Sequence, residues 1–247
     1  MSIVEKKKKI QTCPFSNLVI GGIKNYSDIV FDPKRFKMKN INHVRDLVNT
    51  IDVEKKRILL KDKQSLKYDF LILSPGISFK WNNLAELKDD KSILPHCWDG
   101  DKNLIDFKKK IDGLDDKSNI IISSPDYPYR CPPAPYERAS LIAHYLKKKK
   151  KNFKIIILDS KDSFTKKDLF FHEWKTYYKD HIEWIGRSDG GQIQSVNSKT
   201  KTVTTNSGLK LKADLIHIIP NQAASKLFFD SRLIKKNWCE VNPINFE

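Results

Sequence analysis

The sequence lacks the patterns that mark metal centres, membrane spans and exported proteins. Its four cysteines lie far apart without a CxxC pair, and its six histidines form no HExxH motif, so the common zinc spacings are excluded. No apolar run reaches the length of a membrane-spanning helix. No signal peptide, a charged and then apolar leader with a cleavage site, is readable. The chain has no internal repeat, and its 247 residues, 39% of them hydrophobic, are enough for one large domain or two smaller ones.

Positive charge is abundant, and most of it comes from lysine rather than arginine. The formal net charge is +16, from 46 basic and 30 acidic residues, and most of the basic residues are lysines in tracts such as residues 6–9 and 147–151. Arginine, which binds phosphates and base edges in a forked geometry, is scarce. We therefore expect a solvated lysine-rich surface and consider nucleic-acid binding unlikely. An acidic protein partner on the basic face is a better hypothesis.

The most informative segment is a proline-rich turn around Cys131. It follows an apolar run at residues 119–124 (NIIISS), which predicts a strand, and it leads into residues 136–146, which predict a helix. Pro135 is suited to the first turn of that helix. Backbone N–H groups at the helix start, together with the charge of Arg130, favour a thiolate at Cys131. The sequence thus predicts a reactive sulfur held at a strand-to-helix turn, while an unreactive packed cysteine is the alternative reading.

The second half of the chain alternates between strand and helix signals. Strands are expected at residues 154–158 and 182–185, with a helix at 166–178 between them. This order is typical of a parallel doubly wound sheet in an α/β protein. A small antiparallel meander is expected at residues 192–212, and a further strand at 214–219. The chain after residue 220 is expected to be irregular.

The first half gives weaker signals. Short strands are predicted at residues 2–5, 57–60 and 68–73, the last two joined as a hairpin. A helix is predicted at residues 104–111, and a charged connector at 112–118 suggests a domain boundary. Glu137 and Arg138 are expected to form an ion pair at the start of the helix that follows the cysteine turn.

Many segments taken together resemble the flavoprotein subunit of flavocytochrome c sulfide dehydrogenase, a relative of the sulfide:quinone oxidoreductases. The cysteine–proline segment is the most specific. In chain order, the matching segments are residues 12–17 (TCPFSN), 19–22 (VIGG), 68–69 (YD), 73–77 (LSPGI), 79–81 (FKW), 94–96 (LPH), 130–133 (RCPP), 135–144 (PYERASLIAH), 158–159 (LD), 182–184 (IEW), 219–220 (IP) and 238–239 (WC).

The resemblance implies a glutathione-reductase-like architecture of two Rossmann-type domains. Residues 1–116 would be a partial FAD-binding domain, 117–220 an inserted domain similar to an NAD(P)-binding domain, and 221–247 the start of the return to the FAD domain. The implied reaction oxidises sulfide through a cysteine redox centre and FAD, and passes the electrons to a c-type cytochrome subunit. The family also implies a periplasmic location.

Site residues carry over from the resemblance position by position. Cys131 matches one half of the redox disulfide, and Cys13 matches the cysteine to which the flavin can be covalently attached. Glu5 matches the acid that binds the adenosine ribose. Pro75 and Gly76 match a turn that passes close to the dinucleotide, where the absence of a side chain permits the approach. A plain surface acid at Glu5 and an unmodified thiol at Cys13 are the alternatives.

Several family features are not found in this sequence. Ala134 stands where the family has glycine, and neither the GxGxxG motif, the late flavin motif nor the second redox cysteine is present. Cys239 matches a different family position, and Cys97 has no assigned role. We therefore expect weak FAD binding by this chain alone. The alternatives to a flavocytochrome-type sulfide dehydrogenase are a non-catalytic remnant or binding module, and a quinone-linked sulfide oxidoreductase.

Overall fold

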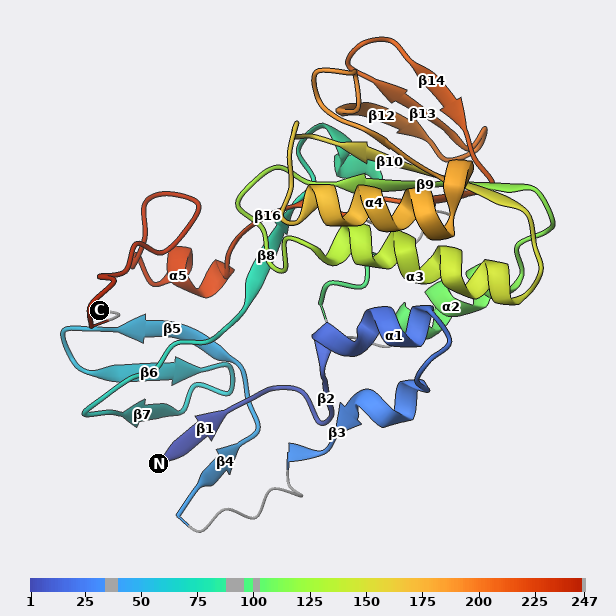
Figure 1. Ribbon diagram of the computed structural model, residues 1–247. Helices are drawn as coiled ribbons and strands as arrows, with labels where there is room; N and C mark the ends of the chain where they lie inside the picture. Colours follow the sequence, from blue (N-terminus) through green and yellow to red (C-terminus); the bar gives the residue numbers. More distant parts are fainter. Residues whose placement is uncertain (34–39, 88–95, 100–102, 246–247) are drawn as a thin grey trace. The chain divides into compact units, whose positions relative to one another are not determined.

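The computed structural model describes residues 1–247 except 34–39, 88–95, 100–102 and 246–247, so residues 94–95 of one matching segment lie outside the described residues. The chain divides into two units (Figure 1). Unit 1 contains Met1–Ile10, Phe31–Phe79 and Gln222–Glu247, and unit 2 contains Gln11–Val30 and Lys80–Asn221. Unit 2 combines residues from both sides of the predicted boundary at residue 116, and that boundary stays a prediction.

A parallel four-stranded sheet forms the centre of unit 2. Its strands, in spatial order, are β11 (Ile182–Ile185), β10 (Phe153–Asp159), β9 (Ser118–Ser124) and β15 (Leu215–His217). Each neighbouring pair is parallel, with Ile121 opposite both Ile156 and Ile216. Near-continuous apolar runs suit such strands, because both faces of a parallel sheet are covered. These strands confirm the predicted parallel sheet and its alternation of strands and helices.

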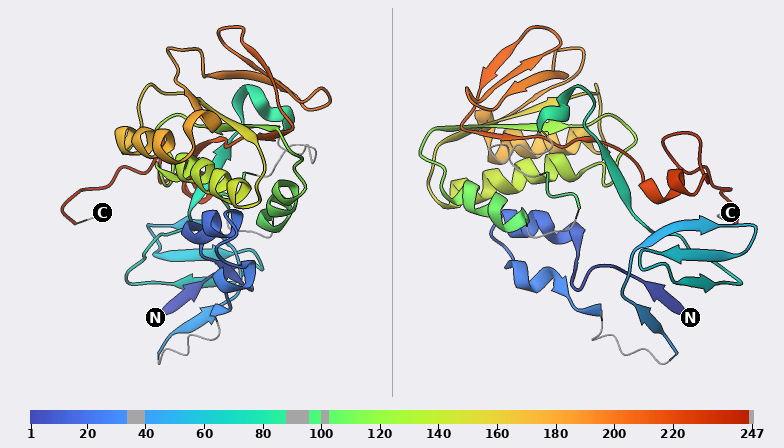
Figure 2. Two further views of the ribbon diagram at one scale, coloured as in Figure 1. Left: turned by 45° about the vertical axis from the view of Figure 1, so that its right-hand side comes forward. Right: turned by 180° about the vertical axis from the view of Figure 1, so that it is seen from behind.

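Helices cover one face of this sheet and a meander covers the other (Figures 1 and 2). Both α3 (Ala134–Lys148) and α4 (Lys167–Tyr177) lie on the same face, as crossovers of the same hand require. The meander contains β12 (Ile193–Asn197), β13 (Thr202–Thr205) and β14 (Lys210–Lys212). Val196 and Val203 of the meander join Ile121, Leu158 and Ile216 of the sheet in one buried cluster.

Short helices complete unit 2. They are η1 (Cys13–Phe15), α1 (Ser16–Ile20), η2 (Tyr26–Ile29), η4 (Asn82–Leu87), α2 (Asn103–Asp112) and η5 (Lys179–His181). Helix α1 packs against α2 and α3. The chain leaves α1 through Gly22, whose φ of +68° suits glycine, and a Cβ there would lie 2.8 Å from the Tyr145 ring of α3. This close approach seats α1 on α3.

Unit 1 is built from short strands and one helix. Strand β1 (Ser2–Val4) pairs in parallel with β4 (Asn42–Val44). The antiparallel sheet contains β5 (Val48–Asp52), β6 (Arg57–Leu60) and β7 (Ser65–Lys67). Helix α5 (Lys226–Asp230) and the pairs β2 (Ile10–Gln11) with β3 (Val30–Phe31) and β8 (Ile77–Lys80) with β16 (Asn221–Ala224) complete the described elements. Ile51, Ile58 and Leu60 form the core.

Two local predictions are wrong. Residues 68–73 form no strand, because the partner of β6 is β7, which ends at residue 67. The segment does alternate: Leu71 and Leu73 contact the core, while Phe70 and Ile72 are 95% and 87% exposed. The chain after residue 220 is also more regular than expected, since β16 forms there and the Ser225 hydroxyl accepts a hydrogen bond at the start of α5.

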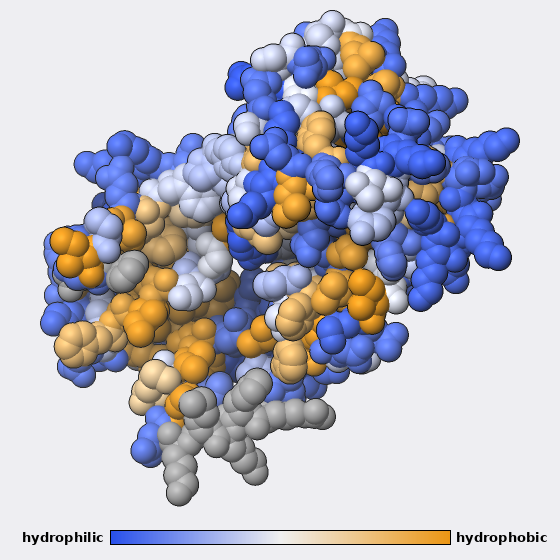
Figure 3. Space-filling model, viewed as in Figure 1, coloured by the Kyte–Doolittle hydropathy of each residue, from blue (hydrophilic) through white to orange (hydrophobic). Residues whose placement is uncertain are grey.

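Around α3 and α4, the surface of unit 2 is largely hydrophilic in the view of Figure 3, whereas the surface around α1 is more apolar. The lysines at positions 147–150 are exposed, as predicted for a solvated basic face. In the described part of the chain, every helix is too short or too polar to span a bilayer.

Candidate functional site

Cys131 lies in the loop between the end of β9 and the start of α3. The loop is held from both sides, because the Ala134 N–H donates to the Cys131 carbonyl at 3.0 Å and the Tyr129 hydroxyl donates to the Pro132 carbonyl at 2.8 Å. Pro135 occupies the first turn of α3. Cys131 itself has a φ of +62°, in the left-handed region that few residues other than glycine adopt. The predicted strand, cysteine turn and helix are confirmed, and the turn fixes the thiol in a strained conformation.

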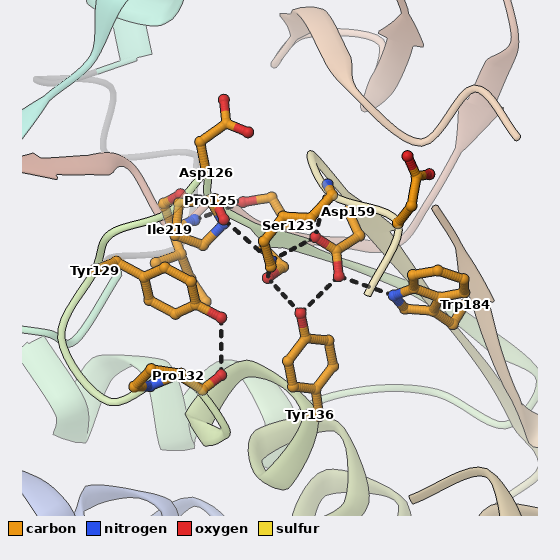
Figure 4. Close-up of polar contacts among 12 residues, drawn as sticks. Ser123, Pro125, Asp126, Tyr129, Pro132, Tyr136, Asp159, Trp184 and Ile219 are labelled. Atoms are coloured by element: carbon orange, nitrogen blue, oxygen red, sulfur yellow. Dashed lines mark hydrogen bonds and ion pairs between the residues drawn. The ribbon is translucent and has the colours of Figure 1, made fainter. Parts of the chain in front are cut away.

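A buried polar cluster supports this loop from below (Figure 4). Asp159, at the end of β10, is fully buried and accepts hydrogen bonds from the Tyr136 hydroxyl at 2.6 Å and the Trp184 indole at 2.8 Å. Lys161 pairs with the same carboxylate at 2.6 Å, and also donates to the Ser124 hydroxyl at 2.7 Å and the Pro125 carbonyl at 3.1 Å. The cluster therefore ties the ends of two strands to the first turn of α3 and to the first residue of the loop.

Burial controls the protonation of this cluster. Desolvation, and then the charge of Asp159, raise the pKa of the Tyr136 hydroxyl far above its ordinary value. Desolvation lowers the pKa of Lys161, although Asp159 opposes that shift. Tyr136 therefore remains a hydrogen-bond donor throughout the neutral pH range.

A pocket of about 210 Å³ opens beside Cys131, and every residue that lines it belongs to unit 2. The loop contributes Cys131 and the start of α3 contributes Arg138, while Cys13 comes from η1. Cys131 is exposed, Cys13 is partly buried and Cys97 is buried, and all three are thiols. The lining residues are Cys13, Pro14, Ser16, Asn17, Cys97, Trp98, Arg130, Cys131, Ala134, Glu137 and Arg138.

Arg138 is a buried cation in the wall of this pocket, with only 1% of its surface exposed. Its Nε donates to Asn17 Oδ1 at 2.9 Å, and its Nη1 donates to the His96 carbonyl and to His217 Nε2, both at 2.7 Å. The guanidinium lies over the Trp98 ring, 4.3 Å from its centroid. Because arginine can only donate, His217 must accept through Nε2.

The charges of these groups follow from their burial. Desolvation lowers the pKa of Arg138 to about 10, so the guanidinium remains charged at neutral pH. Desolvation, and then the charge of Arg138, hold the pKa of His217 well below its ordinary value, which keeps this imidazole neutral. The salt bridges among the described residues include none to Arg138. The pocket therefore contains a buried positive charge whose hydrogen-bond partners are neutral.

The predicted ion pair between Glu137 and Arg138 is wrong. Adjacent residues on a helix point in different directions, so their side chains do not meet. Asn17 bridges them instead: its Nδ2 donates to Glu137 Oε2 at 2.8 Å, while its Oδ1 accepts from Arg138. Helix α1 thus orients both charged side chains toward the pocket.

The expectation of a lowered pKa at Cys131 is also wrong. Desolvation by the pocket walls, and then the negative charge of Glu137, raise the pKa of this thiol. Arg130 and Arg138 act in the opposite direction but do not outweigh these effects. Cys131 is therefore held mainly as a thiol beside a carboxylate.

The structure brings two of the predicted site residues together and leaves the other three in unit 1. Cys13 and Cys131 line the same pocket. Arg130, which directly precedes Cys131 in the chain, has its Nη2 4.0 Å from Cys13 Sγ. Glu5 follows β1 and accepts a hydrogen bond from the Lys7 N–H at 2.7 Å. Pro75 and Gly76 precede β8. The roles assigned to these five residues stay predictions.

Sequence reasoning missed part of the pocket. It gave no role to Asn17, and it placed Arg138 in an ion pair with Glu137 at the start of the helix. One signal was available: Arg138 falls on the face of the helix that also carries Ala139, Ile142 and Leu146, all of them buried. An arginine within the apolar stripe of a helix indicates a buried charge with a specific environment.

In comparisons with known proteins, the chain is similar to flavoproteins that oxidise sulfide. Residues 105–220 match the family model described as "Sulfide dehydrogenase [flavocytochrome c] flavoprotein chain, central". The mitochondrial sulfide:quinone oxidoreductase of Dictyostelium discoideum is 29% identical over 150 residues, which are 59% of this chain and 32% of that protein. The chain therefore spans about a third of this curated relative.

Solved structures show the same fold at low sequence identity. The sulfide:quinone oxidoreductase of Aquifex aeolicus matches with a TM-score of 0.76 and 14% identity, over 93% of this chain and 54% of that one. NDH2 of Plasmodium falciparum, in complex with NADH, gives 0.69 and 12%, over 93% and 52% of the two chains. A NAD-dependent persulfide reductase from A. fulgidus gives 0.68 and 12%, over 94% and 43%.

These matches confirm the predicted fold class, an α/β protein of the kind formed by flavoproteins with two dinucleotide-binding domains. The chain covers about half of the structures that it resembles. It is related to the FAD flavoproteins of the sulfide dehydrogenase and sulfide:quinone oxidoreductase group.

Proposed function

We propose that this chain is part of a flavin-dependent sulfide oxidoreductase in which Cys131 receives the sulfur of the substrate. One observation carries the proposal: Cys131 and Cys13, the two cysteines that the family resemblance assigns to sulfur chemistry and to flavin attachment, line one pocket of about 210 Å³. They are 118 positions apart in the sequence (131 − 13), so their meeting is a consequence of the fold. A pair of unreactive core cysteines has no reason to share a solvent-accessible pocket with two arginines.

FAD is the cofactor that we propose, and the residues fit it. Gly76 has a φ of +83°, and a Cβ built there meets nothing within 4 Å, so its backbone has an open space beside it. Glu5 offers a carboxylate after a strand of a parallel pair, which is the usual position for binding ribose hydroxyls. From the family resemblance, we propose a dinucleotide-binding role for Glu5, Pro75 and Gly76 in unit 1 and, as a separate proposal, a flavin-attachment role for Cys13 in unit 2. When bound, the flavin supplies a two-electron acceptor.

The residues of the pocket support the sulfur step. Hydrosulfide adds its sulfur to the thiol of Cys131: the S–S bond forms, both S–H bonds break, and two protons and two electrons leave, so that a persulfide anion remains. A bound flavin would accept the electron pair before it passes to the external acceptor. Glu137 raises the pKa of Cys131, and we propose that its carboxylate takes up the thiol proton as the bond forms. Asn17 keeps that carboxylate in place through the bond from its Nδ2.

The external electron acceptor could be a c-type cytochrome or a quinone, and the comparisons give arguments for each. The family model is that of a flavocytochrome c flavoprotein chain, which favours a c-type cytochrome subunit. A periplasmic location is a further proposal, which rests on the family resemblance alone. The relatives from Dictyostelium discoideum and Aquifex aeolicus are quinone oxidoreductases, which favour a quinone. We propose the cytochrome first, because the cysteine at position 13 belongs to the flavocytochrome pattern.

The test is sulfide-dependent electron transfer by the chain after incubation with FAD. Flavin content is measured first, by absorbance before and after acid precipitation, because covalent flavin stays with the protein. Sulfide is then added with either oxidised cytochrome c or a short-chain quinone. We expect reduction of the acceptor that depends on both sulfide and flavin.

Two cysteine variants and a control make this test specific. Cys131→Ser should abolish acceptor reduction, and Cys13→Ser should release the flavin on acid precipitation. Cys239→Ser should change neither, because Cys239 is exposed in unit 1 and does not line the pocket. A Cys131→Ser protein as active as the wild type contradicts the proposal. Because we expect weak FAD binding by this chain alone, FAD is added in large excess; a chain that takes up no flavin even then contradicts the proposal and supports a non-catalytic binding module.

A further inference from the structure

Arg138 has a hydrogen-bonding capacity that its protein partners do not use. Its Nε and Nη1 donate to Asn17, the His96 carbonyl and His217, but no hydrogen bond from Nη2 is found among the described residues. All of these partners are uncharged, since burial keeps His217 neutral. A buried guanidinium usually has a carboxylate or another anion as its partner. Arg138 therefore has both a charge and a donor available to a ligand.

The pocket that Arg138 lines is small and has a net positive charge. The lining includes Arg138 and Arg130 as cations and Glu137 as the single acid, so the ionised lining carries a net charge of +1. The Glu137 carboxylate already accepts a hydrogen bond from Asn17, which holds it on the far side of the amide from Arg138. A volume of about 210 Å³ is large enough for an anion of a few atoms beside the thiols. Attraction between charges is stronger in such a pocket than in open water.

The position of Arg138 relative to the cysteines gives this charge a use. The electrostatic influence of its guanidinium reaches Cys13, Cys97 and Cys131, so it acts on every thiol of the pocket. Arg130, by contrast, is a residue of the loop rather than of α3, and its Nη2 lies 4.0 Å from the Sγ of Cys13. Arg138 is fixed by four neutral groups, counting the Trp98 ring beneath it, and cannot move away from the pocket. It is therefore suited to bind an anion inside the pocket rather than to pair with a mobile carboxylate on the surface.

We propose that Arg138 is the anion-binding residue of this pocket and holds a small sulfur anion against Cys131. By the proposed function, on which the identity of this anion rests, the anion is hydrosulfide before the S–S bond forms and the terminal sulfur of the Cys131 persulfide afterwards. No electrons move in the binding step. Arg138 neutralises the negative charge that remains on the terminal sulfur, and Trp98 excludes water from beneath the guanidinium.

Alkylation of Cys131 tests this without flavin or sulfide. Iodoacetate and iodoacetamide form the same kind of thioether bond with loss of iodide, but only iodoacetate is an anion. Rates at Cys131 and Cys239 are read from the same sample by peptide mass spectrometry. We expect the ratio of the iodoacetate rate to the iodoacetamide rate to be about fivefold higher at Cys131 than at Cys239. This is the factor by which a unit positive charge about 4 Å away favours a carboxylate in water. Equal ratios at the two cysteines would overturn the proposal.

Variants separate an anion-binding role from a structural one. Arg138→Lys keeps the charge and should keep most of the raised ratio, whereas Arg138→Gln should bring it to the value at Cys239. Arg130→Gln is the matched control and should lower the ratio less than Arg138→Gln does. A structural role would change both rates at Cys131 together and leave their ratio the same in Arg138→Gln, which would refute the proposal.

A measurement on the wild-type chain covers the case in which Arg138→Gln fails to fold. Sulfate, an anion that reacts with neither thiols nor iodoacetamide, should slow the reaction of iodoacetamide at Cys131 but not at Cys239, compared with chloride at the same ionic strength. Absence of this protection contradicts the proposal. Anion binding without any sulfide-dependent electron transfer would refute the proposed function alone, and electron transfer without anion binding would refute only the role of Arg138.

Discussion

Replacing Lys161 with methionine should destabilise the fold more than removing any surface lysine. Lys161 and Asp159 are 8% and 0% exposed, and the pair stands at 2.6 Å. Without the ammonium, Asp159 stays buried with hydrogen bonds from the Tyr136 hydroxyl, the Trp184 indole and the backbone N–H of residue 161. Breaking a buried pair by removing one partner costs about 3–5 kcal/mol, and the three remaining bonds favour the lower end. We therefore expect Lys161→Met to lose about 3 kcal/mol of unfolding free energy.

Lys154→Met provides a matched control, because Lys154 lies on β10, the strand that ends at Asp159, but forms a more exposed ion pair. Lys154 pairs with Glu183 at 2.8 Å, but these side chains are 35% and 48% exposed. An exposed pair contributes about 0–1 kcal/mol. Urea unfolding followed by circular dichroism should thus separate the two variants by about 2 kcal/mol or more. Adding Asp159→Asn to Lys161→Met should recover part of the loss, because the uncompensated charge is removed. A Lys161→Met protein no less stable than Lys154→Met would refute this account of the cluster.

Two further predictions concern protonation in the pocket. Glu137→Gln should lower the pKa of Cys131 and speed its alkylation by iodoacetamide near neutral pH, because the Glu137 charge raises that pKa; a pH series of alkylation rates checks this, and an unchanged midpoint would contradict it. His217 stays neutral when folded, with a pKa well below 6.5. As the pH falls below that value the unfolded chain binds a proton that the folded chain does not, so stability should fall by up to about 1.4 kcal/mol per pH unit. His217→Gln should remove this slope from urea unfolding curves measured between about pH 7 and pH 5, and an identical slope in wild type and variant would count against a neutral His217.

Local structure in unit 2 could be predicted because its signals are local. The apolar run before Ser124 and the prolines around Cys131 lie within a few residues of the elements that they specify. The same reasoning failed at residues 68–73, where an apolar run after a polar turn indicated the second strand of a hairpin. One side of that segment does contact the core, but periodicity cannot show whether a neighbouring strand is present to pair with it.

The pocket could be predicted only in part, because its properties depend on contacts between distant residues. Arg138 meets Asn17 across 121 positions, and His217 across 79. No spacing in the sequence indicates these contacts, so Arg138 was assigned to a helix-start ion pair. The sign of the Cys131 pKa shift depends on how far the pocket walls desolvate the thiol. Charges on neighbouring residues were visible in the sequence, but this burial was not.

The most direct test of the central claim is to find where substrate sulfur becomes attached. Flavin-loaded chain is mixed without oxygen with less than one equivalent of sulfide, the thiols are blocked, and the peptides are analysed by mass spectrometry. The account predicts one additional sulfur atom on the peptide that contains Cys131, and none on the peptide that contains Cys239. Bleaching of the flavin by sulfide with no added sulfur on Cys131 would contradict it.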